Sequence, residues 1–221
     1  QKLSTIDLFF AGGAQDREQA IVMADLKKKK AHVLKQQIES GIPALFVCGA
    51  PQLMGNFYEP AIGERIEGVG IFDIQTKHPG ENAKRLIGNI VAKINWHNLN
   101  DSEGAATNSP QGWNHSYMVG FENHGGRTTL GPNAKSLASV IIGFGNNGDD
   151  QTEGVVYKNA IGTYSHGPLL PKNPQIADYL IKKTLEVKYQ KEVSLKPLDD
   201  SLEEKARASM LQKLKVPQSE D

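Results

Sequence analysis

The chain has 221 residues, with 25 basic and 25 acidic side chains and a formal net charge of +0 at pH 7. This balance argues against a protein that binds nucleic acid by neutralising many phosphates. The single cysteine excludes an intramolecular disulfide and a zinc site built from several cysteines, and it fits a reducing compartment. No apolar run approaches the roughly 18 residues of a membrane helix, and no signal peptide is visible. We therefore expect a cytoplasmic protein without a membrane span.

Residues 4–55 alternate between patterns typical of strands and patterns typical of helices. Strands are predicted at residues 4–10 and 43–47, and helices at residues 16–40, with a break near Lys30, and from Pro51 onward. Residues 43–47 are apolar throughout, which is typical of a parallel strand buried on both faces. The alternation of strand and helix predicts an α/β fold with a parallel sheet.

Residues 68–164 change to short strands separated by Gly, Asn and Asp turns. These strands are predicted at residues 70–76, 87–94, 117–122, 138–144, 155–158 and 161–164. The polar residues 95–114 predict a long surface loop. No composition break divides the chain, so we expect one domain over residues 1–221, with a core over about residues 5–190.

The C-terminal part of the chain predicts two helices. Asn173 and Pro174 suit the N-cap and first positions of a helix that continues to about residue 185. Residues 201–204 have capping-box spacing and begin a last helix that ends near Leu214. This last helix belongs to a C-terminal segment over about residues 191–221, of which residues 216–221 are expected to fray.

The strongest chemical signal is the stretch L-F-V-C-G-A-P-Q-L-M-G at residues 45–55. A cysteine on a sharp turn between a buried strand and a helix projects from the carboxyl edge of the sheet, where clefts of α/β folds form. The helix N-terminus favours the reactive thiolate. Gly49 leaves its backbone N–H free to hold an oxyanion. We predict that Cys48 is a nucleophile, and the alternative is a buried structural cysteine.

A cysteine nucleophile needs a base, and six histidines are available. His166 follows a predicted strand and precedes a loop, which places it at a sheet edge like Cys48. We predict that His166 is this base, and the alternative is a structural or surface histidine. His124 lies in the polar cluster F-E-N-H-G-G-R-T at residues 121–128, which suits a pocket lining. The others are expected at the surface: His32, His78, His97 and His115.

Two glycine-rich segments have different interpretations. The turn at residues 11–14 follows the first strand and suits the presentation of backbone N–H groups to an oxyanion. Residues 143–148 match G-x-G-x-x-G, but a strand rather than a helix follows them, so we predict a hairpin or loop and no dinucleotide site. The chain also lacks G-x-x-x-x-G-K-[ST], which argues against ATP binding by a P-loop.

The motifs C-G-A-P-Q-L-M-G (residues 48–55) and H-G-P (residues 166–168) occur together in a known family. With them, the sequence resembles the class I glutamine amidotransferases of the cobyric acid synthase type, and most closely the glutaminase subunits of lipid II isoglutaminyl synthases. Further segments are similar to that family at residues 12–19, 121–128 and 157–173. The resemblance covers residues 5 to about 185.

The resemblance implies an α/β fold and a reaction. The fold is a flavodoxin-like three-layer sandwich with a mostly parallel sheet and a nucleophile elbow, and a strand and a helix would precede residue 5. Cys48 would attack the side-chain amide of L-glutamine, His166 would move the proton, and the N–H groups of Gly49 and Gly13 would hold the oxyanion. Water would then release glutamate.

The resemblance also implies a partner. Ammonia would pass to a Mur-ligase-like synthase subunit, which would use ATP and magnesium to amidate the α-carboxylate of D-glutamate in lipid II during peptidoglycan biosynthesis. This chain would need no cofactor or metal of its own. Three alternatives remain: an amidotransferase for another acceptor such as a corrin precursor, a free-standing γ-glutamyl hydrolase, and an inactive scaffold subunit.

Two further residues are expected to bind glutamine. We predict that Arg127 holds the α-carboxylate, because a guanidinium suits bidentate carboxylate binding and Gly125 and Gly126 leave room beside it. The alternative is a surface arginine. Gln52, one helical turn beyond the cysteine, is a second candidate for this pocket.

The sequence departs from the family pattern in ways that bear on activity. Ala50 and Pro51 interrupt a usual C-G-G-[YF]-Q motif, Ala14 stands at a frequent glycine, and the 95–114 loop looks long. The family also commonly carries Glu two residues after the catalytic histidine, where this chain has Pro168.

A third member of the catalytic triad must therefore come from elsewhere. Glu122 of this chain is one source, and an Asp or Glu of the partner subunit is the other. We favour the partner, because a lone subunit would otherwise hydrolyse glutamine wastefully.

Overall fold

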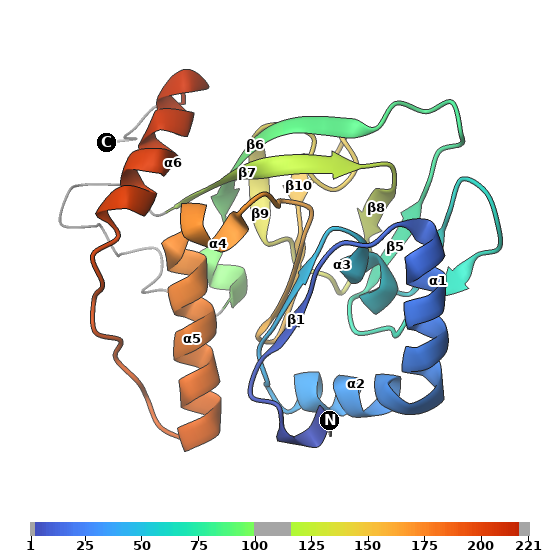
Figure 1. Ribbon diagram of the computed structural model, residues 1–221, viewed down its shortest axis with the longest axis horizontal. Coiled ribbons are helices and arrows are strands. Elements are labelled where there is room, and N and C mark those ends of the chain that lie inside the picture. Colours follow the sequence, from blue (N-terminus) through green and yellow to red (C-terminus); the bar gives the residue numbers. More distant parts are fainter. Residues whose placement is uncertain (1–2, 100–115, 217–221) are drawn as a thin grey trace.

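The computed structural model describes residues 3–99 and 116–216. Strands in these ranges form three four-stranded sheets, and helices cover both faces of the sheet that carries the cysteine (Figure 1). Most of the predicted loop (residues 100–114), His115 and residues 217–221 lie outside the described residues.

The first sheet, which we call the central sheet, has the strand order β1-β2-β12-β11. Its strands are β1 (Phe9–Ala11), β2 (Ala44–Val47), β12 (Ala160–Thr163) and β11 (Val155–Tyr157). β2 pairs in parallel with β1 and β12, and β11 is antiparallel to β12. Every residue of β2 is buried, which confirms the predicted buried parallel strand. Because β1, β2 and β12 are parallel, their carboxyl ends meet at one edge.

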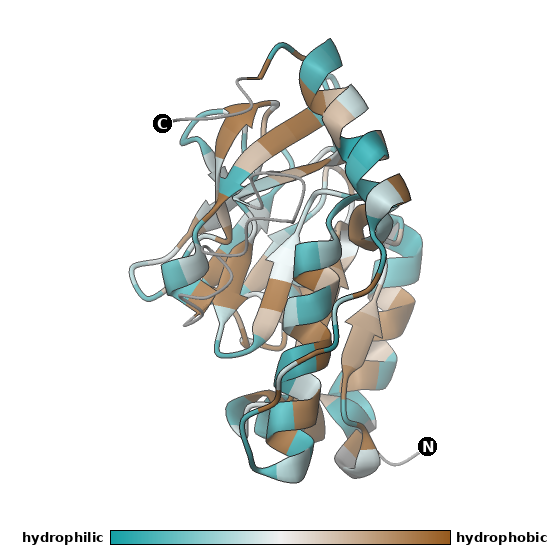
Figure 2. Ribbon diagram, turned by 90° about the vertical axis from the view of Figure 1, so that its left-hand side faces the viewer, coloured by the Kyte–Doolittle hydropathy of each residue, from teal (hydrophilic) through white to brown (hydrophobic). Residues whose placement is uncertain are grey.

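Two sets of helices cover the central sheet. One face carries α1 (Asp16–Asp25), the π-helical turn η2 (Leu26–Lys30), α2 (Ala31–Glu39) and α3 (Gly49–Met54), and the other carries α4 (Leu169–Lys172) and α5 (Pro174–Tyr189). Alternate residues of β2 serve the two faces: Phe46 packs with Met23 and Ile38, and Leu45 packs with Ile176. The helices mix polar and apolar residues, as expected for elements with one buried face (Figure 2).

The second and third sheets lie beside the central sheet and are mainly antiparallel. The second, β10-β9-β6-β7, contains β6 (Leu86–Ile94), β7 (Tyr117–His124), β9 (Ala138–Ile142) and β10 (Thr152–Glu153). The third, β4-β3-β5-β8, contains β3 (Phe57–Glu59), β4 (Ile66–Glu67), β5 (Ile74–Lys77) and β8 (Arg127–Leu130). Parallel pairing in the described ranges occurs only within the central sheet and between β3 and β5.

The last helix, α6 (Ser201–Lys213), covers β7. Its Leu211 packs with Val119 of β7 and with Val216, which follows the helix. Among the described helices, none is long and apolar enough to cross a membrane.

Two predicted segments differ in the structure. The predicted strand at residues 4–10 begins instead as a 3-10 helix, η1 (Leu3–Thr5), because only β1 finds a pairing partner in the short β2. The predicted surface loop begins with a second 3-10 helix, η3 (Trp96–Leu99). Trp96 and Leu99 are buried there, since the indole packs against Tyr179 of α5 with ring centroids 6.3 Å apart.

The predicted helix caps also differ. The side chain of Asn173 does not cap α5. It is buried and bonds Val119 through both backbone groups, at 2.8 Å each, so it fastens α5 to β7. The capping box predicted at residues 201–204 is absent, because Ser201 is already helical and Glu204 is buried.

Candidate active site

The backbone of Cys48 makes the sharp turn predicted from the sequence. Cys48 follows β2 directly and precedes α3, with φ 59° and ψ −104°. Residues other than glycine seldom adopt a positive φ, and this combination also lies outside the left-handed helical region. Such strain persists only where the surroundings enforce it, and it clusters at functional sites. Here the Cys48 N–H donates a 2.8 Å hydrogen bond to the Thr163 carbonyl, which ties the turn to β12.

Two glycines surround the thiol at close quarters. A Cβ on Gly13 would lie 3.1 Å from the Cβ of Cys48 and 3.4 Å from its Sγ. A Cβ on Gly49 would lie 2.6 Å from the Gln19 amide nitrogen and 2.9 Å from the Ala14 carbonyl oxygen. The turn after β1 and the start of α3 therefore meet beside the cysteine, as the oxyanion hypothesis requires.

The surroundings of Cys48 have opposing effects on the pKa of its thiol. Burial raises the pKa of the thiol above its usual value, whereas the Gly49 N–H and the positive charge of Arg85 lower it. Burial is the largest of these effects, so the thiol is favoured in the resting site. A base is therefore needed to generate the thiolate.

His166 lies near the carboxyl end of β12, the strand adjacent to β2. Its backbone forms an antiparallel bridge with Phe121 of β7, with hydrogen bonds of 2.8 and 3.0 Å, and the two rings lie 5.8 Å apart. Burial, aided by His124, lowers the pKa of the His166 imidazole, and Glu122 opposes this change. The neutral imidazole, which accepts a proton, is therefore favoured near pH 7.

A hollow of about 380 Å³ opens at this edge of the central sheet. It is lined by His166, by the glycines at positions 12, 13 and 167, and by apolar side chains that include Phe10, Leu45, Val47 and Leu169. Gly13 lines this hollow together with His166 and also lies against Cys48, which does not itself line the hollow. Gly13 therefore connects Cys48 and Gly49 with His166 in one region of the molecule.

Glu122 is buried, and its carboxylate oxygens bond groups other than His166. Its carboxylate accepts hydrogen bonds from the N–H groups of Phe144 and Gly145 at 2.6 and 2.9 Å. Phe121 and His166 are directly bridged, so their side chains share one face of the pair, and the next residue points to the other face. The nearest imidazole to Glu122 is that of His124, at 3.9 Å.

Arg127 is tied to backbone carbonyls. Its guanidinium donates to Gly125 and Lys84, at 2.7 Å each, and to Gly126 at 3.4 Å. Burial lowers the pKa of this guanidinium below its ordinary value. These bonds hold the turn between β7 and β8, so much of the donor capacity predicted for a substrate is already used.

A second arginine, which the sequence analysis missed, lies at the same turn. Arg85 donates to the Asn123 side chain and carbonyl at 2.9 and 3.0 Å, and a Cβ on Gly125 would lie 3.3 Å from its Nη1. Its charge reaches the Cys48 thiol. No local motif marks Arg85, because the contact depends on the pairing of β6 with β7.

Both ends of the Gln52 side-chain amide bond other residues inside the protein. Its carbonyl oxygen accepts from the Gln19 amide at 3.0 Å, and its amide donates to the Tyr164 hydroxyl at 3.0 Å. Ala50 and Pro51, which depart from the family motif, are buried in the first turn of α3. Position 52 therefore anchors α3, and the prediction that it binds substrate stays untested.

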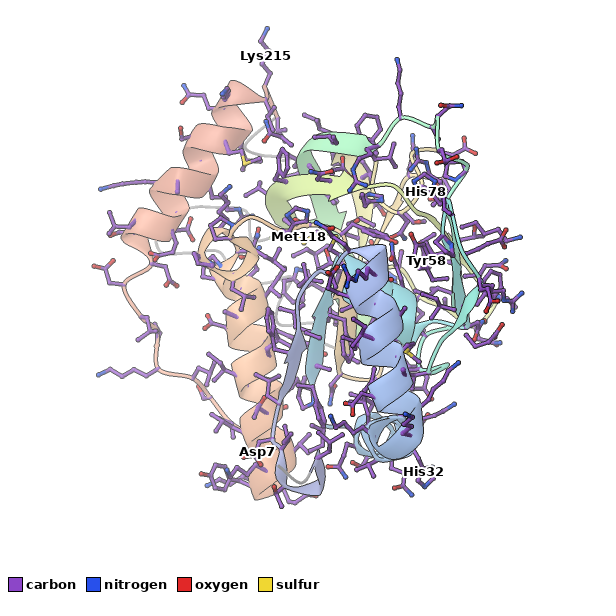
Figure 3. The ribbon with its side chains drawn as sticks, turned by 45° about the vertical axis from the view of Figure 1, so that its right-hand side comes forward. Asp7, His32, Tyr58, His78, Met118 and Lys215 are labelled. Carbon is purple, nitrogen blue, oxygen red and sulfur yellow. The ribbon has the colours of Figure 1, made fainter. Side chains whose placement is uncertain are left out.

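The remaining described histidines differ in burial. His32 and His97 are exposed, and Figure 3 shows His32 far from His78. His78 is half-buried, and a Cβ on Gly125 would lie 2.5 Å from its Nε2. His124 is buried and stacks on Tyr164 with ring centroids 3.8 Å apart. The expected surface position is thus confirmed for His32 and His97.

Comparisons with known proteins agree with this geometry. A family model described as the CobB/CobQ-like glutamine amidotransferase domain matches residues 1–174. Among solved structures, one described as a glutamine amidotransferase superposes with a TM-score of 0.53 at 11% identity, covering 81% of this chain and 79% of that chain. This similarity confirms the predicted fold.

Two curated relatives are similar over most of this chain. One is the lipid II isoglutaminyl synthase (glutamine-hydrolyzing) subunit GatD of Staphylococcus aureus, 43% identical over 182 residues, which are 82% of this chain and 65% of the relative. The other is the subunit of the same name from Streptococcus pneumoniae, 39% identical over 196 residues, 89% of this chain and 68% of the relative. The chain thus spans about two thirds of the length of these relatives.

Proposed function

The chain belongs to the family of CobB/CobQ-like glutamine amidotransferase domains, and we propose that it is the glutaminase subunit of a lipid II isoglutaminyl synthase. The proposal depends above all on Cys48, a strained cysteine at the end of β2, with Gly13 against its thiol and His166 beyond the adjacent strand β12. The relatives in Staphylococcus aureus and Streptococcus pneumoniae carry this function in their names.

The first half of the proposed reaction forms a thioester. His166 takes the thiol proton, and the Cys48 sulfur bonds to the side-chain amide carbon of L-glutamine. The carbonyl oxygen becomes an oxyanion, which the backbone N–H groups of Gly49 and Gly13 stabilise. His166 then returns the proton to the leaving nitrogen, the C–N bond breaks, and ammonia departs.

The second half restores the enzyme. Water adds to the thioester carbon, and His166 accepts its proton. The C–S bond breaks, glutamate leaves, and His166 returns the proton to the Cys48 sulfur, which regenerates the thiol. The net reaction converts glutamine and water into glutamate and ammonia. The ammonia passes to a Mur-ligase-like partner, which uses ATP and magnesium to amidate the α-carboxylate of D-glutamate in lipid II.

The triad carboxylate comes, in this proposal, from the partner subunit. Two observations support that source over Glu122: its side chain points to the face away from His166, and its oxygens accept the N–H groups of Phe144 and Gly145. The Nε2 of His166 is buried and has no hydrogen-bond partner among the described residues, so no acid of this part of the chain bonds that nitrogen. Ammonia release is thereby coupled to the docking of a receiver.

Glutamate release by this chain, alone and with the Mur-ligase-like partner, tests the proposal. The isolated chain should hydrolyse glutamine slowly, and the partner should raise kcat clearly. The complex with ATP should add an amide to D-glutamate of lipid II, as measured by mass spectrometry. A partner variant that lacks one Asp or Glu carboxylate should lose the stimulation and still form the complex.

Three other outcomes would overturn parts of the proposal. A fully active isolated chain that Glu122→Gln inactivates would establish the internal acid. Ammonia transfer to a corrin precursor in place of lipid II would establish another acceptor. No hydrolysis under any condition would leave a scaffold subunit.

A further inference from the structure

A continuous chain of buried hydrogen bonds runs beneath the site. The Gln19 amide nitrogen donates to the Ala14 carbonyl at 3.1 Å and to the Gln52 carbonyl oxygen at 3.0 Å. The Gln52 amide nitrogen donates to the Tyr164 hydroxyl at 3.0 Å. That hydroxyl lies 2.6 Å from the Thr128 hydroxyl, which lies 2.7 Å from the Thr76 hydroxyl. Each of these five side chains is at most 5% exposed.

The chain links every segment that carries a proposed functional group. Ala14 follows the glycine turn that lies against the thiol, and Gln52 belongs to α3, which begins at the nucleophile. Tyr164 precedes His166 by two residues, and Thr128 follows Arg127 on β8. The hydrogen-bonded residues come from three parts of the fold: the helix layer of α1 and α3, the segment that follows β12 of the central sheet, and β8 of the third sheet.

The direction of the hydrogen bonds is set from one end. The Ala14 carbonyl only accepts, so the Gln19 amide must face it with nitrogen. The same nitrogen then requires the oxygen of Gln52, which leaves the nitrogen of Gln52 to face Tyr164. Because the Tyr164 hydroxyl accepts from Gln52, its proton is directed to Thr128.

The phenol of Tyr164 is suited to this fixed role. Burial raises the pKa of Tyr164 to about 12, so the hydroxyl stays a neutral donor at any physiological pH. The ring also stacks on the buried His124 with an interplanar angle of 16°, which restricts its rotation. The hydroxyl is therefore held by both polar and aromatic contacts.

We propose that Tyr164 is a positioning residue. Through Gln52 and Gln19 it fixes the relative positions of three segments: the turn at Cys48, the glycine turn at residues 11–14, and the segment that carries His166. The proposal rests on the proposed role of Cys48 as the nucleophile. Loss of the hydroxyl leaves buried polar groups unpaired, and a network of this kind then loses its geometry as a unit. The position of the Gly49 N–H should change most when the network is broken, because Gly49 lies against Gln19 and Ala14.

The reactivity of Cys48 toward iodoacetamide tests this proposal without the need for glutamine. Cys48 is the sole cysteine of the sequence, so alkylation reports on it alone. Tyr164→Phe should raise the pKa of the thiol in the pH profile and slow alkylation at pH 7 by about tenfold, the effect of one lost hydrogen bond to a buried group. The matched control is Tyr179→Phe, another buried tyrosine of the central layers, which should leave the profile unchanged.

Two further comparisons separate positioning from general destabilisation. Thr128→Val should slow alkylation, and Thr128→Ser, which keeps the hydroxyl, should restore it; this pair serves even where Tyr164→Phe fails to fold. The double variant Gln19→Leu with Tyr164→Phe should react no more slowly than the slower single variant, since both break one chain.

The outcomes distinguish this proposal from the proposed function. A Thr128→Val profile identical to that of Thr128→Ser, or equal effects of Tyr164→Phe and Tyr179→Phe, would overturn it. Independent, multiplying effects of the two single substitutions would do the same. If the substitutions show these coupled effects on alkylation but the chain never hydrolyses glutamine, the positioning role is supported and the proposed glutaminase function is refuted.

Discussion

The two sides of the site use their polar groups in opposite ways. On the nucleophile side, Cys48 sits in a strained backbone, and the glycines at positions 13 and 49 lie against it with no side chains of their own. On the β7–β8 side, the charged groups serve the fold: the Glu122 carboxylate accepts two backbone N–H groups, and the Arg127 guanidinium donates to three carbonyls. The first side leaves the thiol without competing side chains at positions 13 and 49, whereas the charged groups of the second side are used in hydrogen bonds to the backbone.

Removal of the thiol should have the largest effect on activity. Cys48→Ala should abolish glutamine hydrolysis, because no other cysteine can form the thioester. The fold should remain intact, as measured by circular dichroism, and an electrophilic glutamine analogue should label the unmodified chain alone. Hydrolysis retained by Cys48→Ala would contradict the whole functional assignment.

Removal of the base should have the next largest effect. His166→Ala should lower kcat/KM by several orders of magnitude, as in related systems of nucleophile and base. The pH profile of the unmodified chain supplies the sign: the pKa of His166 is lowered, and only its neutral form accepts the thiol proton. Activity should therefore persist to slightly acidic pH and fall as protonation sets in below the usual histidine pKa. A profile that rises toward acid would be inconsistent with His166 as the base.

Variants of the two arginines separate a role in glutamine binding from a role in holding the turn between β7 and β8. Arg85→Ala should raise KM for glutamine by about tenfold, the effect of one charged hydrogen bond, with a smaller fall in Tm than that of Arg127→Ala, because this side chain is exposed and its charge acts on the thiol. Arg127→Ala should lower Tm, because three backbone carbonyls lose their donor. Steady-state kinetics and thermal unfolding of both variants decide the matter. A raised KM with an unchanged Tm in Arg127→Ala would restore the carboxylate-binding role predicted from the sequence.

The smallest expected effect concerns Glu153, a buried acid of β10 that accepts hydrogen bonds from residues at the end of β12. Burial raises the pKa of Glu153, so the folded state binds its proton more tightly than the unfolded state does. The resulting stabilisation is present at acidic pH and is lost as pH rises above the unfolded pKa of about 4.5, since ionisation then favours unfolding. Glu153→Gln keeps an acceptor for Thr163 and Tyr164 and should be more stable than the unmodified chain near pH 7. For a chain of this length, each kcal/mol of added stability raises Tm by about 2–4 °C. The difference should vanish near pH 4, and a constant difference would argue against this account.

Local order along the chain made the nucleophile side predictable. The apolar run of β2, the cysteine and the following glycine lie within a few residues, and their geometry follows from the strand-to-helix turn alone. The interruption of the first long helix near Lys30 is likewise a local feature, and η2 lies there.

Contacts between distant residues limited the prediction on the β7–β8 side. Arg127 reaches Lys84, and Glu122 reaches Phe144, through strand pairings that no single window of sequence contains. Strands β4 and β10, with two residues each, are too short to show alternation. The predicted asparagine cap failed for the same reason, because the Asn173 side chain found a better partner in Val119 across the core.

The positive φ of Cys48 implies a conflict between stability and activity at one position. A backbone of this shape costs of the order of 1–3 kcal/mol for a residue with a side chain, whereas glycine adopts it freely. A search for stabilising substitutions would therefore favour glycine at position 48, a change that removes the reactive sulfur. The protein keeps a strained cysteine at a position where glycine would adopt the same backbone without strain. Stability alone therefore gives no reason to retain a cysteine there.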